Sequence, residues 1–125
     1  MKIDQRFKKG LELFNKGEYF ECHEVIEDLW LETDPKDPYR DLYKGVIQAA
    51  AAIYQLDRGI LSGARGLFST SVSYLKEYSP VVLGLNIEKL IKDLQTYFAA
   101  PGTEGGKEGP PGKRRFPQAE YDFKQ

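Results

Sequence analysis

The sequence has few of the residues that most often carry redox, covalent or metal chemistry. Its 125 residues include one cysteine, one histidine, one methionine and one tryptophan. Because Cys22 is the single cysteine, no disulfide can form within the chain, which excludes a disulfide-stapled secreted domain. The reducing cytoplasm fits this composition best, and we expect the protein there. A single histidine also excludes the common zinc sites that draw on several histidines or cysteines.

Long apolar runs and an excess of one charge sign are lacking as well. The longest apolar stretch, around residues 45–56, is too short to cross a bilayer, and residues 1–7 carry charges where a signal peptide needs an apolar run. The 18 basic and 19 acidic residues leave a net charge of −1. No basic field is therefore present to attract nucleic-acid phosphates or anionic lipids. We expect a protein that binds neither nucleic acid nor a membrane.

Apolar residues three to four positions apart are abundant, and this spacing is typical of amphipathic helices. Asp4 and Asn86 are natural N-caps, whereas Gly17, Gly59 and the Ser79-Pro80 step are expected to end helices. The predicted helices cover approximately residues 4–16, 18–32, 39–57, 61–78 and 87–98. The sequence thus predicts an all-α fold.

The third predicted helix is the expected spine of the fold, because residues 46–54 are apolar nearly all round and include four alanines. Two glycine turns also resemble each other: Gly17 is followed by the small Cys22, and Gly59 by the small Ala64. In tetratricopeptide-type hairpins a glycine makes the turn and a small residue lets the second helix nest against the first. We therefore predict a compact bundle of about five antiparallel helices in tetratricopeptide-like hairpins.

The composition changes abruptly after Ala100. Residues 101–112 are rich in proline and glycine and have little apolar surface to offset the entropy lost on ordering, so we expect them to be flexible or extended. Phe116, Tyr121 and Phe123 follow, and they could pin the end of the chain onto the helices. We divide the chain into a helical domain, residues 1–100, and a Pro/Gly-rich C-terminal tail, residues 101–125.

The second predicted helix carries the best candidate for a polar site. His23 and Glu27 are four residues apart and Trp30 follows three residues later, so the three share one face. Gln48 interrupts the apolar third helix, and a buried amide needs partners, for which the His23/Glu27 pair is the obvious choice. Three further residues of the third helix or its end could close this network. They are Tyr43, Tyr54 and Arg58.

Three interpretations of this site stay open. A zinc protease is disfavoured, because catalytic zinc usually takes three ligands and no second histidine is present. A divalent cation such as manganese or iron suits a carboxylate-rich set better, drawn from His23 with Glu24, Glu27 or Asp28. The third interpretation is a satisfied polar network that fixes the packing of two helices. No catalytic residue is assigned.

Two strings carry a resemblance to a known family: residues 17–30, GEYFECHEVIEDLW, and residues 45–54, GVIQAAAAIY, with Arg58-Gly59 close behind. Together they resemble the bacterial and archaeal family called domain of unknown function 309, over the first four predicted helices. The family is marked by a histidine, a glutamate four residues later and an aromatic residue three after that, here His23, Glu27 and Trp30. The resemblance implies a fold and a site at which metal binding has been suggested, and it implies no particular activity.

Two positions depart from the family pattern. Gln55 stands where relatives often have a histidine, and Ile60 stands where they often have asparagine. The absent second histidine removes a plausible ligand and so weakens the metal interpretation for this chain. We therefore carry two hypotheses for function. The first is a non-enzymatic protein-interaction or structural module with a protein partner or a second copy of itself, and the second is a small metal-dependent or acid/base enzyme of the hydrolase type that uses His23 and Glu27.

Overall fold

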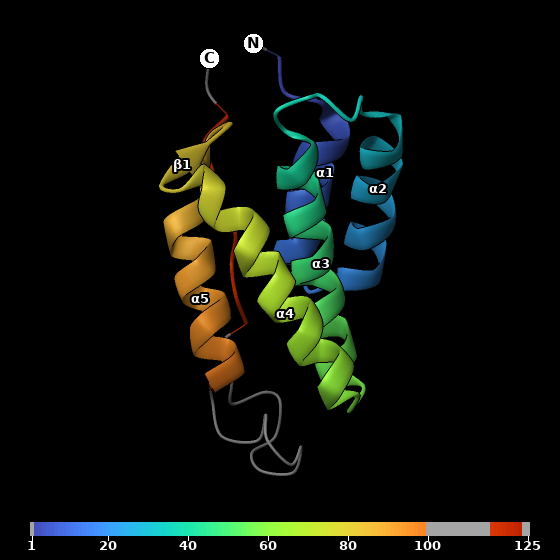
Figure 1. Cartoon of the computed structure of the whole chain (residues 1–125), viewed down its shortest axis with the longest axis vertical. Helices are drawn as coiled ribbons and strands as arrows, with labels where there is room; N and C mark the ends of the chain where they lie inside the picture. Colours follow the sequence, from blue (N-terminus) through green and yellow to red (C-terminus); the bar gives the residue numbers. More distant parts are fainter. Residues whose placement is uncertain (1, 100–115, 124–125) are drawn as a thin grey trace.

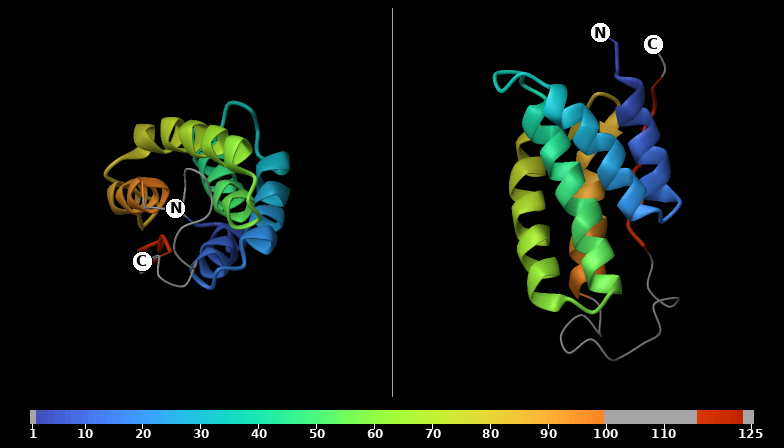
Figure 2. Two further views of the ribbon diagram at one scale, coloured as in Figure 1. Left: turned by 90° about the horizontal axis from the view of Figure 1, so that it is seen from below. Right: turned by 90° about the vertical axis from the view of Figure 1, so that its right-hand side faces the viewer.

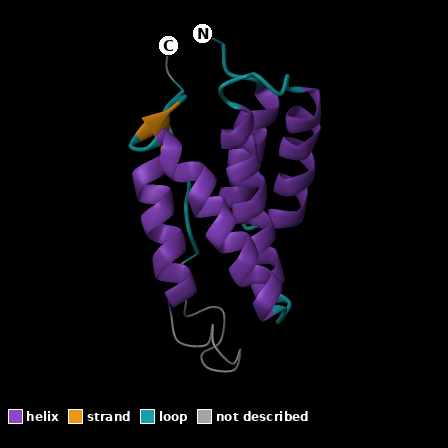
Figure 3. Cartoon of the chain, viewed as in Figure 1, coloured by secondary structure: helices purple, strands orange, loops and turns teal. Residues whose placement is uncertain are grey.

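A computed structural model describes residues 2–99 and 116–123 (Figure 1). The described part of the chain is almost entirely helical, with one short hairpin of strands (Figure 3). This confirms the all-α prediction. The elements in chain order are α1 (Gln5–Asn15), α2 (Tyr19–Glu32), α3 (Arg40–Asp57), α4 (Leu61–Leu75), the 3-10 helix η1 (Lys76–Tyr78), β1 (Val81–Val82), β2 (Leu85–Asn86) and α5 (Ile87–Ala99).

The helices follow one another around an arc, and each packs against its neighbours in the sequence. Seen from below, the arc runs from α1 through α2, α3 and α4 to α5, and residues 116–123 lie in the gap between α5 and α1 (Figure 2). Consecutive helices run in opposite directions, as the short connections require. No helix within the described ranges has the length and apolar character needed to cross a bilayer.

Helix α3 is the centre of the packing, as its apolar middle predicts. It contacts α2 on one side and α4 on the other, and its alanines 49, 50 and 52 are fully buried. Glycine allows a close approach to α4, because a Cβ atom at Gly45 would lie 2.8 Å from Cδ2 of Leu75. Small residues at these contacts let the helices approach more closely than larger side chains would allow.

Both predicted glycine turns are present. Gly17 and Gly59 each have a φ of +80°, which glycine adopts at no steric cost. The small residues that follow them, Cys22 and Ala64, are fully buried, so that α2 nests against α1 and α4 against α3. The two helical hairpins predicted from these glycines, α1–α2 and α3–α4, are confirmed.

The two predicted N-caps also form. The Asp4 side chain accepts a hydrogen bond from the Arg6 amide at 2.8 Å, and the Asn86 side chain accepts one from the Lys89 amide at 2.9 Å. Helix α4 is shorter than predicted: it ends at Leu75, and residues 76–78 continue as the 3-10 helix η1. Tightening of a last helical turn to 3-10 geometry leaves the amphipathic spacing almost unchanged, so the sequence pattern does not reveal it.

The hairpin of β1 and β2 is not predicted from the sequence. Val81 pairs with Asn86 and Val82 with Leu85, and the turn between them has positive φ at both Leu83 and Gly84. Two left-handed residues in a two-residue turn are typical of a type I′ hairpin, for which glycine at the second position is favoured. Strands of two residues are too short to show the alternation that identifies a strand.

The described end of the tail packs on the helices, as its aromatic residues predict. Tyr121 forms a β-bridge with Leu85, and the Asn86 amide donates to the Glu120 carbonyl at 2.9 Å. The ring of Phe116 lies 6.3 Å from that of Tyr19 and 5.5 Å from that of Tyr97, measured between centroids. Residues 101–112, for which we expect flexibility, lie outside the described residues, and the division into a domain and a tail stays a prediction.

Candidate functional site

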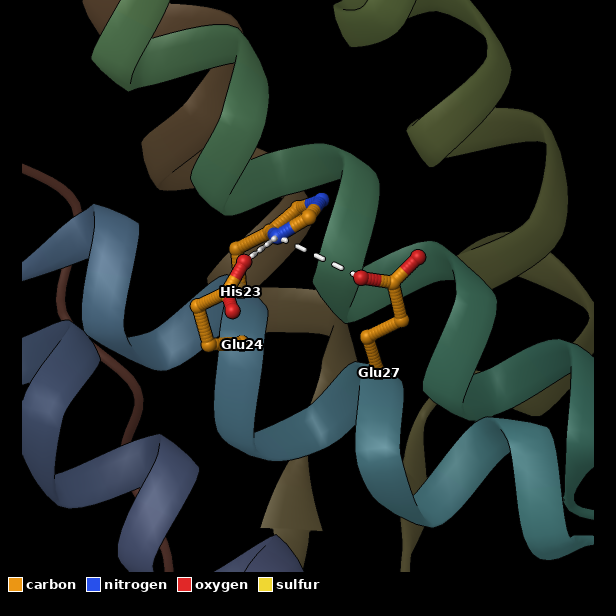
Figure 4. Close-up of side chains that lie close together, drawn as sticks. All are labelled: His23, Glu24 and Glu27. Carbon is orange, nitrogen blue, oxygen red and sulfur yellow. Dashed lines mark ion pairs between the residues drawn. The ribbon is translucent and has the colours of Figure 1, made fainter.

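His23, Glu24 and Glu27 form a cluster on the outer side of α2. The imidazole Nδ1 lies 3.6 Å from Oε2 of Glu24 and 3.9 Å from Oε1 of Glu27 (Figure 4). Both distances exceed those of a hydrogen bond, so the three groups face one another without direct bonding. The His23 side chain is 30% exposed, and the two carboxylates are more exposed.

The separations in this cluster suit the ligands of one cation. One ligand atom from each of the three side chains can be chosen so that all lie within 4.8 Å of one another. Two ligands bonded to one ion at about 2.1 Å lie roughly 3.0 to 4.2 Å apart, depending on the angle between them. The distances from Nδ1 to both carboxylates fall in this range. One imidazole and two carboxylates favour manganese or iron over zinc. Asp28 does not belong to this group among the described residues.

A cavity adjoins this cluster between α2 and α3. Its volume is about 180 Å³, and His23 is one of its walls, so that one side chain takes part in both the cluster and the cavity. The rings of Phe20 and Tyr54 lie 5.8 Å apart at its edge and are 51% and 36% exposed. The residues that line the cavity are Tyr19, Phe20, His23, Ala51, Tyr54 and Gln55.

Arg58 interacts with the rim of this cavity through Tyr54. Its Nη1 donates a hydrogen bond of 3.5 Å to the Tyr54 hydroxyl, and its guanidinium lies 5.4 Å from the centre of the same ring. The structure therefore brings three of the predicted site residues, His23, Tyr54 and Arg58, to one end of the α2–α3 contact.

Gln48 does not form the hydrogen bonds that we expected with the His23/Glu27 pair. No hydrogen bond joins Gln48 to His23 or Glu27 within the described part of the chain, and its Oε1 is buried without a partner. A buried acceptor in this state costs about 1 to 3 kcal/mol. The expected hydrogen-bonded network through Gln48 is therefore absent, because His23 faces Glu24 and Glu27 and lines the cavity beside Tyr54 and Gln55 instead.

The indole ring of Trp30 packs against two positively charged side chains at the start of α3. The guanidinium of Arg40 and the ammonium of Lys44 both lie 4.2 Å from the centre of the indole ring, and the indole Nε1 is buried without a hydrogen-bond partner. Arg40 and Lys44 are not predicted as site residues from the sequence. Their spacing of four residues at the start of α3 places them on one face, which is the signal that could identify them.

Burial suppresses the acidity of two groups beneath the site. Tyr19 is buried and its hydroxyl has no hydrogen-bond partner, and burial raises the pKa of this phenol well above its usual value. Burial likewise raises the pKa of the Cys22 thiol to about 12. A thiol that stays protonated is a poor nucleophile. Cys22 is therefore an inert, buried side chain.

Comparison with known families gives a match over the part of the chain that holds the site. Residues 7–67 match the model of a family described as Domain of unknown function (DUF309). This segment resembles the DUF309 family. The match confirms the resemblance carried by His23, Glu27 and Trp30, and it covers most of α1, all of α2 and α3, and the start of α4.

A curated relative supports the same assignment. The chain is 36% identical over 83 residues to the protein of Bacillus subtilis (strain 168) described as uncharacterized protein YpuF. The aligned region covers 65% of this chain and 47% of the relative, so the chain spans about half the length of that protein. Every residue that lines the cavity, and the whole His23 cluster, lies within the DUF309 segment. Helix α5 and residues 116–123 lie outside it.

Proposed function

We propose that this helical domain is a non-enzymatic protein-interaction module, and that it binds its partner through the α2–α3 face. This face is the surface formed by Phe20, His23, Glu27, Tyr54 and Arg58. The observation that carries the proposal is the exposed pair of rings, Phe20 and Tyr54, beside an open cavity. Exposed aromatic side chains next to a cavity are characteristic of the residues that contribute most to binding at interfaces. The unpaired Cys22 thiol supports a cytoplasmic location.

Site-specific photo-crosslinking tests this proposal. A photoreactive phenylalanine analogue replaces Phe20 in the full chain, and the matched control places it at Val81, a similarly exposed apolar residue in β1. After irradiation in cells that naturally contain the protein, we expect one discrete adduct from position 20 that is absent from position 81. Tyr54→Ala in the same chain should weaken that adduct, because the second ring of the pair is removed. Equal labelling from both positions, or none from position 20, would refute the proposal.

The His23 cluster supports a second candidate, a small metal-dependent or acid/base enzyme. The supporting observation is that the imidazole Nδ1 of His23 lies 3.6 Å from a carboxylate oxygen of Glu24 and 3.9 Å from one of Glu27, within the range for two ligands of one divalent cation. The residues His23, Glu24 and Glu27 would supply half of an octahedral shell and leave the other positions for water or substrate.

Metal analysis separates the two candidates. The chain is purified without a histidine tag or chelators and compared with a His23→Ala variant and with a Glu88→Gln control, which alters an exposed carboxylate on α5. The metal candidate requires about one equivalent of manganese or iron in the native chain and the control, and its loss in His23→Ala. An unchanged background level of metal in all three proteins would refute the metal-dependent candidate.

A further inference from the structure

Helix α2 carries an excess of negative charge. Its residues Tyr19–Glu32 include five acidic side chains and no lysine or arginine. The helix dipole favours Glu21 in the first turn and disfavours Glu32 in the last, so it does not account for the carboxylates between them. Glu32 is compensated by Arg6, at 3.1 Å, but no ion pair involves Asp28 in the described part of the chain. The acidic character of this helix therefore points to something outside it.

Two large apolar side chains are exposed on the same helix. Phe20 is 51% and Leu31 65% exposed, although most residues of this type in the chain are buried. Together with Glu24 and Glu27 they follow the spacing i, i+4, i+7 and i+11, so the four form one stripe along α2. We call it the α2 stripe. It extends over about 16 Å, with an apolar residue at each end and two carboxylates between them.

This arrangement has the form of one half of a helix–helix contact. A partner helix that follows such a stripe presents its own side chains at i, i+3 or i+4 and i+7. Its apolar residues would cover Phe20 and Leu31, and the one beside Phe20 would reach the cavity next to Tyr54. Positive charges opposite Glu24 and Glu27 favour the correct register, and like charges there are repelled.

We infer that the α2 stripe docks a basic amphipathic helix of another protein, with two lysine or arginine residues between two large apolar residues. This inference rests on the proposed function and names the chemistry of the partner. Charge complementarity selects the basic helix over an acidic or uncharged one, since α2 has five acidic residues and no lysine or arginine.

Binding of a designed peptide tests the inference directly. The probe is a fluorescent helical peptide of about 18 residues with leucines on one face and two lysines between them. The matched control peptide has both lysines replaced by glutamate. Anisotropy titration of the full chain should show saturable binding of the lysine peptide that weakens as salt rises, and no binding of the glutamate peptide.

Variants of the chain then locate the binding site. The double change Glu24→Gln/Glu27→Gln should weaken binding about 2- to 30-fold, as the loss of two exposed ion pairs implies. The control Glu77→Gln/Glu88→Gln removes the same charge from exposed positions outside α2 and should leave the affinity unchanged. Equal losses in the two double variants, or equal binding of both peptides, would overturn the inference.

The photo-crosslinking experiment distinguishes a failure of this inference from a failure of the proposed function. A position-20 adduct whose cross-linked peptide is a basic helix supports both. An adduct with an acidic or extended segment, or with a second copy of this chain, overturns the basic-helix inference and leaves the interaction module standing. The absence of any position-20 adduct overturns the module itself.

Discussion

Asn15 holds the end of the chain in place, and its replacement by alanine should release residues 116–123. The Asn15 Nδ2 donates to the Ala119 carbonyl at 2.9 Å, and its Oδ1 accepts from the Ala119 amide at 2.6 Å. Both bonds use one amide side chain and join positions far apart in the sequence. At about 0.5 to 1.5 kcal/mol for each bond, their loss should weaken docking of this segment by about 1 to 3 kcal/mol.

Amide hydrogen exchange measures this change where it occurs. In Asn15→Ala we expect the Ala119 and Asp122 amides to exchange about 5- to 150-fold faster, which is that free energy expressed as a ratio of rates. The Asp122 amide donates to the Gly84 carbonyl at 2.9 Å and does not contact Asn15, so its acceleration would report release of the whole segment. Amides in the middle of α3 are the internal control. Unchanged exchange at Asp122 would show that the segment is held independently of Asn15, contrary to this reasoning.

Three further predictions concern single positions. Gly17→Ala should destabilise the fold by about 1 kcal/mol in denaturant unfolding, because its φ is +80°, whereas Gly66→Ala, in the interior of α4 with open space around it, should be neutral or stabilising. Because burial raises the pKa of Cys22 to about 12, the folded state keeps a proton that the unfolded state loses near pH 9, and stability should therefore fall as the pH rises between these values. In urea titrations a Cys22→Ser variant should show a smaller fall, which begins at higher pH because it comes from groups such as Tyr19, whose pKa burial also raises. Lys44→Gln should alter the fluorescence of Trp30, the single tryptophan, and cost about 0.5 to 1 kcal/mol; an unchanged emission spectrum would contradict the contact.

The helices are predictable because each carries its own local signals. Asp4 and Asn86 cap helices whose apolar spacing is regular, and Gly17 and Gly59 supply the left-handed residue that ends a helix. These features depend on residues within one turn of each other, so the sequence alone contains them. The β1–β2 hairpin has strands of two residues, too short for a periodic pattern, and its further bridge to Tyr121 joins positions far apart in the chain.

In the candidate site, too, the features that depend on one helix are predictable, and those that depend on the packing of two helices are not. The His23–Glu27 spacing is a property of one helix, and the structure keeps the two side chains on one face. The cavity depends on which turn of α2 lies opposite which turn of α3, and this register is fixed by packing over the whole contact. Hence the part of the wall formed by Phe20 and Gln55 is not predicted from the sequence, and the expected pairing of Gln48 does not occur.

Residues 116–123 also cover the two ends of the helical arc. Hairpins of this type can stack one on another without limit, because each leaves an apolar surface that the next repeat covers. Here the last such surface, between α5 and α1, is filled by an extended segment of the same chain that bonds to Asn15 on one side and to β2 on the other (Figure 2). Among the described residues the arc is thereby closed into a ring, and the sides of α5 and α1 that face this gap are covered by the same chain.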